Sequence, residues 1–339
     1  MANRSYALDP AVDINSRAAS PEPSWYRTPI ARPDLKALVE RDDRTAAKDY
    51  ALWAVLLLAS GTLAVMSWGS WWAVPAFLVY GVIYSSCDSR WHELSHGTPF
   101  KTRWLNETLY HLTSFMSVRE GHRWRWSHAR HHTHTIHVGR DPEIHGPRPT
   151  NIWALLSGLL YIRGGLRELK SIAIHATGRI LPDAALYVPK SEWPKMVWTC
   201  RIYLVLFAGL AAWCVMIGSL LPAMLIGLPR FYGGFLHYIQ AMTQHLGLAE
   251  DVADYRLNTR TVLMNRVNRF LYSNMNYHIE HHMYPMVPFY RLPDLHARIA
   301  ADCPPPYPSI TAAYAEIIPT VWRQRVDAEH YARRPPVTA

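Results

Sequence analysis

The chain has 339 residues, 50% of them hydrophobic, with 14 Trp and 19 Tyr. This hydrophobic and aromatic content is high for a soluble enzyme, so we expect a membrane protein. The mean hydropathy of -0.09 excludes a chain made mostly of membrane spans. The net charge of +9 would suit a nucleic-acid-binding protein, but Lys and Arg are scattered among Trp, His and Pro. Membrane lipids are therefore the expected partner, and nucleic acid is not.

The chain begins with a polar, proline-containing segment, residues 1–33, which we predict to be a mobile tail. It lacks the apolar core of a secretory signal peptide, so membrane insertion is expected to depend on internal segments. Residues 34–320 are predicted to form a single membrane domain, and residues 321–339 a C-terminal tail.

Four apolar runs are long enough to cross a hydrocarbon core of about 30 Å. They cover residues 50–67, 71–87, 201–218 and 220–242, and Arg230 interrupts the last of them. Short uncharged turns join the first two runs and the last two, which predicts two transmembrane hairpins. The expected fold is an all-α integral membrane protein with four transmembrane helices and a cytoplasmic helical cap that carries the metal site.

Lys and Arg occur in the polar segments before, between and after the hairpins, and neither hairpin turn contains one. Positive charge is enriched on the cytoplasmic side of membrane proteins. The sequence therefore predicts that both termini and the long central segment are cytoplasmic. The expected location is a bacterial inner membrane.

Three histidine boxes follow the predicted spans. Within each box the histidines are separated by one, three or four residues, and separations of three and four place imidazole rings on one face of a helix. Eight imidazoles exceed the needs of a single ion, so two metal ions are predicted. His245, just beyond the fourth span, is a candidate ninth ligand, or else a polar cap for its helix. The eight box histidines are His92, His96, His128, His131, His132, His278, His281 and His282.

The first box also fits HExxH, in which two zinc ligands flank the glutamate base of a metalloprotease, here Glu93. An intramembrane zinc protease needs only one further ligand and would leave both HxxHH boxes without a role, so it is the remote alternative. A non-catalytic metal-binding or transport protein is a second alternative. Its histidines would be expected within the spans rather than beside them.

With these motifs in place, the chain resembles the membrane fatty acid desaturase and hydroxylase superfamily, whose pattern is HxxxH or HxxxxH, then HxxHH and a distant HxxHH. The resemblance covers about residues 52–288 and includes Asp141-Pro142 after the second box and Asn276-Tyr277 before the third. It implies two iron ions bound by the eight box histidines, with His245 as an additional ligand and O2 as co-substrate. Ala241 stands where acyl-CoA desaturases have a supporting asparagine, so that branch matches less closely.

The resemblance implies an O2-dependent oxidase of unactivated C–H bonds, and a fatty acid desaturase is the leading hypothesis. The alternative is a hydroxylase or demethylase of a hydrocarbon or methylated small molecule, because the sequence also resembles the bacterial hydrocarbon oxygenases. No dinucleotide fingerprint or cysteine cluster is present, so a ferredoxin- or rubredoxin-type donor with its reductase is expected to supply electrons.

No catalytic residue is predicted beyond the di-iron centre. Asp88, Asp141 and Glu280 are predicted to accept the second ring N–H of a ligand histidine, and none of them to bind iron directly.

Overall fold

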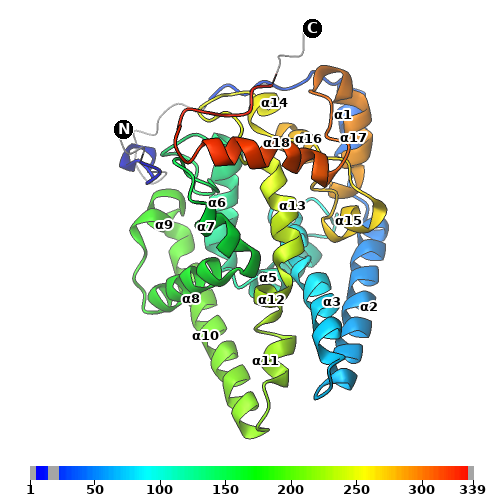
Figure 1. Ribbon diagram of the computed structural model, residues 1–339, viewed down its shortest axis with the longest axis vertical. Coiled ribbons are helices and arrows are strands. Elements are labelled where there is room, and N and C mark those ends of the chain that lie inside the picture. The colour runs from blue at the N-terminus through cyan, green and yellow to red at the C-terminus, as the bar shows by residue number, and fades with distance from the viewer. Residues whose placement is uncertain (1–4, 14–22, 335–339) are drawn as a thin grey trace. The chain divides into compact units, whose positions relative to one another are not determined.

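The computed structural model describes residues 5–13 and 23–334, and it divides the chain into two compact units. Unit 1 consists of Met1–Arg41, Arg125–Leu156 and Gln240–Ala339, and unit 2 of Asp42–Trp124 and Ser157–Ile239. Within the described ranges every regular element is a helix, and extended backbone pairs only at isolated bridges. The prediction of an all-α protein is therefore confirmed (Figure 1).

Unit 2 contains the long helices. Its elements are α2 (Asp43–Ser67), α3 (Ala73–Ser85), α4 (Cys87–Ser95), α5 (Arg103–Met116), η2 (Gly158–Leu160), α8 (Ile162–Ala176), α9 (Pro182–Tyr187), η3 (Lys190–Glu192), α10 (Trp193–Met216), α11 (Leu221–Leu225) and α12 (Pro229–Gly233). Two further helices, α6 (Gly121–His134) and α13 (Phe235–His245), begin in unit 2 and end in unit 1. Helix α7 (Ile152–Ser157) ends at the boundary.

Unit 1 is built from shorter helices and connecting loops. Its elements are η1 (Pro10–Val12), α1 (Arg32–Leu38), α14 (Tyr255–Asn258), α15 (Arg266–Leu271), α16 (His278–Met283), η4 (Phe289–Arg291), α17 (Leu292–Ile299), η5 (Ala300–Asp302) and α18 (Ile310–Arg323). Part of the predicted N-terminal tail packs on this unit, since Trp25 stacks on Tyr255 with ring centroids 4.2 Å apart.

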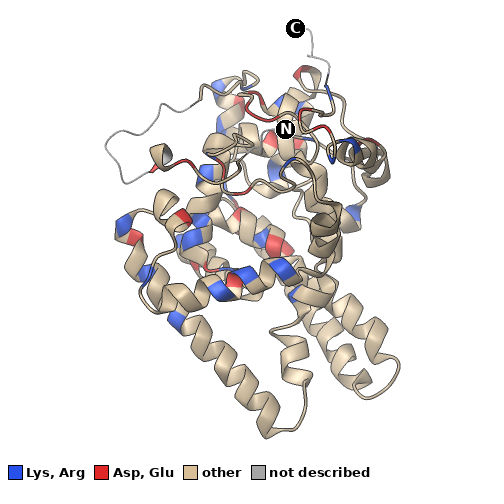
Figure 2. Ribbon diagram, turned by 60° about the vertical axis from the view of Figure 1, so that its left-hand side comes forward, with Lys and Arg blue, Asp and Glu red and all other residues tan. Residues whose placement is uncertain are grey.

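Two segments, Arg32–Ser67 and Lys190–Met216, are helical, long and apolar enough to cross a membrane. Only 28% and 17% of their most apolar windows are buried, so they are not the core helices of a soluble protein. Large apolar side chains point outward on both, for example Leu58 with 70% of its surface exposed and Val205 with 71%. Figure 2 shows the C-terminal halves of these helices, at the bottom of the view, without charged residues. Exposed apolar surface of this extent marks contact with lipid or with another protein.

The second and fourth predicted spans differ from expectation. Helix α3 has 13 residues, about 20 Å of helix. The run 220–242 is not one helix but α11, α12 and the start of α13. Pro222 and Pro229 each stand in the first turn of a short helix, because proline cannot continue the helix before it. The prediction of a continuous fourth span is therefore wrong.

The breaks in this segment free backbone carbonyls, and side chains of unit 2 satisfy them. The hydroxyl of Tyr80 in α3 donates to the carbonyl of Leu225 at 2.6 Å, and that of Tyr84 donates to the carbonyl of Ile226 at 2.7 Å. Helices α3 and α12 touch at Gly233, where a Cβ atom would lie 2.0 Å from the carbonyl carbon of Gly81. Broken helices at membrane depth are tolerated where neighbouring side chains re-satisfy the backbone in this way.

Candidate metal centre

The second and third histidine boxes lie on α6 and α16, and their helical spacing brings rings of one box together. His128 and His132 are four residues apart on α6, and their Nε2 atoms are 3.1 Å apart. His278 and His282 repeat this arrangement on α16, again with 3.1 Å between the Nε2 atoms. The HxxHH spacing thus turns a helix face into a pair of converging nitrogen donors.

Four histidines from three helices form one set within unit 1. His131 comes from α6, His245 from the end of α13, and His278 and His282 from α16. Each offers a ring nitrogen, and these nitrogens all lie within 4.8 Å of one another. The Nε2 atoms of His245 and His278 are 3.1 Å apart. The structure therefore brings the ninth candidate into the same set as three box histidines.

The remaining histidines of these two boxes form a second group in unit 1. His281 Nε2 lies 3.2 Å from His132 Nε2, which is also next to His128. The first box belongs to unit 2, where His92 lies on α4 and His96 directly follows it. Their rings meet edge to face, with centroids 5.4 Å apart.

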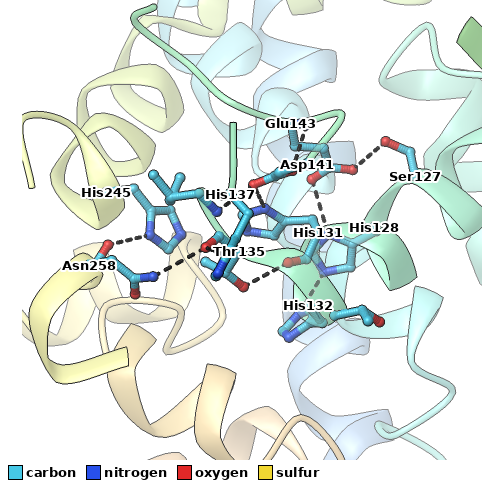
Figure 3. A network of polar contacts seen from close by, with 12 residues as sticks. Ser127, His128, His131, His132, Thr135, His137, Asp141, Glu143, His245 and Asn258 are labelled. Atoms are coloured by element: carbon cyan, nitrogen blue, oxygen red, sulfur yellow. Dashed lines mark hydrogen bonds and ion pairs between the residues drawn. The ribbon is translucent and has the colours of Figure 1, made fainter. Parts of the chain in front are cut away.

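The outer ring nitrogens of three of the four histidines are hydrogen-bonded to protein acceptors, and Figure 3 shows those of His131 and His245. The fourth, His278 Nδ1, lies 3.2 Å from the side-chain amide nitrogen of Gln244. His131 Nδ1 donates to Asp141 at 2.8 Å, and His245 Nδ1 donates to the Asn258 carbonyl, also at 2.8 Å. The hydroxyl of Thr135 donates to a backbone carbonyl, so its oxygen accepts from His282 Nδ1 at 3.2 Å. A donating Nδ1 leaves the lone pair on Nε2, the nitrogen that faces the set.

This donor set fits a divalent metal ion. Burial, together with the neighbouring His131, lowers the pKa of His245 to about 3, and burial also holds the pKa of His282 well below its ordinary value. Neutral imidazoles with lone pairs about 3 Å apart repel one another unless a cation lies between them. Neutral imidazole is a ligand for iron, zinc, copper and nickel. The donor set alone selects a metal of this group and does not select iron.

Asp141 orients His131 from a loop in which backbone N–H groups also donate to the Asp141 carboxylate. Its carboxylate also accepts from the backbone N–H groups of Ile136 at 2.8 Å and Glu143 at 2.7 Å. Burial favours a raised pKa for Asp141, but His131 and these two N–H groups lower it below its ordinary value. The carboxylate is therefore ionised beside His131, in the arrangement that the sequence predicted for this residue.

The structure gives the other two predicted carboxylates different partners. Both oxygens of Glu280 are engaged, one with His296 Nδ1 and one with the hydroxyl of Thr261, each at 2.5 Å. Asp88, in unit 2, accepts from Arg119 at 2.7 Å and from Arg230. Burial would raise the pKa of Asp88, but the two guanidinium groups hold it well below its ordinary value.

Two acceptors of ring N–H groups were missed in the sequence. Glu143 lies 3.2 Å from His128 Nδ1 and also accepts from Ser127, and the Asn258 carbonyl serves His245. A carboxylate two residues after Asp141 is a visible signal for Glu143. No side-chain pattern can reveal a backbone carbonyl that lies 13 residues beyond its partner in the chain.

Comparison with known proteins shows which enzymes this chain is similar to. The fatty acid desaturase family profile matches residues 69–314. A protein of Sorghum bicolor named as a probable fatty acid desaturase is 28% identical, with 81% of this chain and 72% of the relative aligned. An acyl-lipid omega-3 desaturase (cytochrome b5) of the endoplasmic reticulum of Arabidopsis thaliana is 24% identical over 82% of this chain and 73% of its own length. An sn-1 oleoyl-lipid 12-desaturase of Anabaena variabilis is 28% identical over 32% of this chain and 31% of its own.

Proposed function

The chain belongs to the fatty acid desaturase family, and from this premise we propose that it introduces a double bond into an acyl chain at a centre of two iron ions. Members of the family are membrane-associated oxidoreductases that act with O2 and an external electron donor. The observation that carries the proposal is the set of inward-facing ring nitrogens in unit 1, because it provides the neutral donors that the family's chemistry requires.

The ligands of the first iron are proposed to be the four histidines of one set in unit 1, His131, His245, His278 and His282. Those of the second are proposed to include His128, His132 and His281, which lie next to one another in the same unit. Three imidazoles leave a six-coordinate ion short of donors. We propose that His92 and His96 of the first box supply two more, as the box spacing in the sequence predicts.

Iron bound here supplies the activation of O2 and the removal of two hydrogen atoms from neighbouring carbons. The overall reaction takes an acyl CH2–CH2 unit, O2, two electrons and two protons to an alkene and two molecules of water. The protein's own residues hold the donors still. Asp141 fixes the His131 ring, the Asn258 carbonyl fixes His245, and Thr135 fixes His282, so that the lone pairs stay directed inward.

A membrane location suits an acyl substrate, because such a chain is dissolved in the bilayer. We propose that α2 and α10 span the membrane, and that α3 and the broken segment α11–α12 return the chain. The charge distribution in the sequence supports a cytoplasmic position for both termini and the metal centre. A bacterial inner membrane remains our proposal for the location, and the Arabidopsis relative is named for the endoplasmic reticulum.

We propose a one-electron carrier protein as the donor, of the ferredoxin or rubredoxin type that the sequence suggested. The Arabidopsis relative has cytochrome b5 in its name, so a haem carrier is the alternative to test beside them. Carrier identity is decided by adding each reduced carrier to the purified enzyme and comparing the yield of alkene.

Product analysis with the purified enzyme tests the proposal. We expect about two irons per chain and, with reduced carrier, O2 and a saturated acyl lipid, an alkene without incorporated oxygen-18. An oxygen-18-labelled alcohol or a released aldehyde as the only product would identify a hydroxylase or demethylase. A single zinc with peptide cleavage would identify the HExxH protease, and either result would overturn the desaturase.

A further inference from the structure

A hollow of about 480 Å³ in unit 1 leads from the surface to the histidines. It lies between the N-terminal segment, the last turns of α6 and α16 and the start of α14, and it is lined by His132 and His282. Six further residues form its other walls. These are Pro23, Trp25, Arg27, Thr133, Tyr255 and Pro285.

A continuous row of aromatic rings runs along this hollow. The half-exposed Trp25 stacks on Tyr255 with centroids 4.2 Å apart and planes within 3°. Tyr255 is buried, and its ring centroid lies 5.3 Å from that of His282. Three rings in van der Waals contact therefore connect the surface with one histidine of the four-histidine set.

Hydrogen bonds join the same rings to the second histidine group. The hydroxyl of Tyr255 donates to the backbone carbonyl of His132 at 3.0 Å, and Trp25 Nε1 donates to the carbonyl of Thr133 at 2.9 Å. The row thus reaches both groups of histidines in unit 1. Electron tunnelling is far more efficient through bonds and close contacts than through water, so this row is the favourable path through the hollow.

The segment that carries Trp25 is held firmly on unit 1. The hydroxyls of Tyr26 and Thr28 both donate to Asp302 at 2.6 Å. The hydroxyl of Tyr284 donates to the Thr28 carbonyl at 2.5 Å. Contacts of the neighbouring residues Tyr26 and Thr28 therefore hold Trp25 against Tyr255. A reproducible tunnelling path requires such a fixed position.

The wall of the hollow does not suit an acyl chain. Arg27 is exposed at the hollow and places a positive charge there, and the nearby backbone carbonyls are polar. A protein carrier with carboxylates on its docking face matches this charge, because opposite charges steer and orient a transient encounter.

We propose that Trp25 and Tyr255 form the electron entry to the metal centre, and that an acidic one-electron carrier protein docks over the hollow beside Arg27. The carrier is oxidised by one electron in each of two encounters, and the two electrons are those consumed with O2 and two protons in each desaturation. The rings remain closed-shell and act only as the medium for tunnelling. This inference rests on the proposed function.

Reduction kinetics of the iron-loaded enzyme test the path. Trp25→Leu is expected to slow reduction by the carrier by at least about tenfold, while reduction by dithionite stays within about twofold of the wild type, because a small reductant does not need the ring path. Trp25→Phe keeps a stacked ring and is expected to retain most of the rate. Trp322→Leu, which removes an exposed tryptophan of α18, is the matched control. Equal slowing with both reductants, or none with the carrier, would overturn the path.

Docking is measured without iron, on the metal-free full-length protein in detergent with reduced [2Fe–2S] ferredoxin and soluble cytochrome b5 as probes. Arg27→Glu is expected to weaken binding of the productive carrier by about fivefold or more at low salt and by less at high salt. Arg323→Glu, an exposed arginine of α18, is the control. Equal effects of the two substitutions would overturn the docking site. A wild-type enzyme that binds no iron or forms no alkene with either reductant would instead refute the proposed function.

Discussion

Each unit contains a buried polar cluster, and the two clusters differ in how their polar groups are compensated for the loss of water. In unit 2, the Asp88 carboxylate is neutralised by Arg119 and Arg230, so this cluster supplies its own counter-charges. In unit 1, the inner nitrogens of His245 and His278 face each other at 3.1 Å, and His245 Nε2 is an acceptor because His245 Nδ1 donates to the Asn258 carbonyl. The carboxylate of the first cluster thus has its counter-charges within the protein, whereas the second cluster brings uncharged ring nitrogens together in an arrangement that could hold a metal ion.

The largest expected effect comes from removing one inward donor. His278→Ala is expected to reduce turnover by at least about 100-fold and to lose about one iron per chain, because a metal site depends on each of its protein ligands. Iron analysis and alkene yield measure this change. His145→Ala, which removes an exposed histidine outside both groups, is the control and should match the wild type in both measurements. Full iron content in His278→Ala would remove this residue from the ligand set.

A substitution in the Asp88 cluster of unit 2 should lower the stability of the fold rather than the iron content. Asp88→Asn leaves two guanidinium groups without their carboxylate, and we expect a loss of about 3–5 kcal/mol in the free energy of unfolding. Thermal unfolding of the metal-free protein in detergent measures it. Asp294→Asn breaks an exposed ion pair with Arg291 and should cost less than about 1 kcal/mol. Similar losses from the two substitutions would contradict the role assigned to the buried pair.

Glu120 sharpens the comparison, because it is as buried as Asp88, but in the described part of the chain its carboxylate accepts only from the backbone N–H groups of His122 and Arg123. Burial raises the pKa of Glu120 from 4.5 to about 7. Between these values the folded state binds more protons than the unfolded state, so stability falls as the pH rises. At about 1.4 kcal/mol per pKa unit, the rise of the pKa from 4.5 to about 7 corresponds to a fall of about 3.5 kcal/mol.

Glu120→Gln should remove this fall, so that the variant and the wild type differ most in pH dependence between pH 4.5 and about 7. Chemical or thermal unfolding at a series of pH values gives the slope. Asp88 has a lowered pKa, and its contribution is therefore retained throughout this window and lost only in stronger acid. An unchanged slope in Glu120→Gln would show that another group titrates there.

The smallest expected effect comes from a residue that orients a proposed ligand histidine without binding the metal itself. Asp141→Asn keeps the size of the side chain but loses the charge that orients His131, and we expect metal affinity to fall by about 10–100-fold. Competition with a chelator measures the affinity. Asp251→Asn, whose carboxylate accepts from the Val138 backbone N–H, is the matched control. An affinity equal to that of the wild type would limit Asp141 to a role in the loop.

The box histidines of unit 1 could be grouped from sequence because the helical repeat alone places residues three and four apart on one face. Asp141 could be found because it follows its box closely in the chain. Asp88 could not be assigned its partners, since Arg230 is 142 residues away and no local pattern connects them. The Asn258 carbonyl was invisible for another reason, because a backbone acceptor has no residue type of its own.

The positions of the apolar segments could be predicted from the sequence, but the break in the helix over residues 220–242 could not. Composition identified α2 and α10, and both are long enough to cross. Pro222 and Pro229 are visible breakers, yet an uncharged run of residues suggested one helix. What makes the break tolerable is the placement of Tyr80 and Tyr84 opposite the freed carbonyls, and that depends on the packing of α3 against this segment.

These two tyrosines also constrain the order of biogenesis. The α11–α12 segment follows α3 in the chain by more than 130 residues, and its carbonyls at Leu225 and Ile226 find their donors on α3. A ribosome therefore releases the acceptors long after the donors. Until the two meet, the segment must stay where water or the translocation channel can solvate it, so the first hairpin serves as the template on which the last part of the membrane domain is assembled.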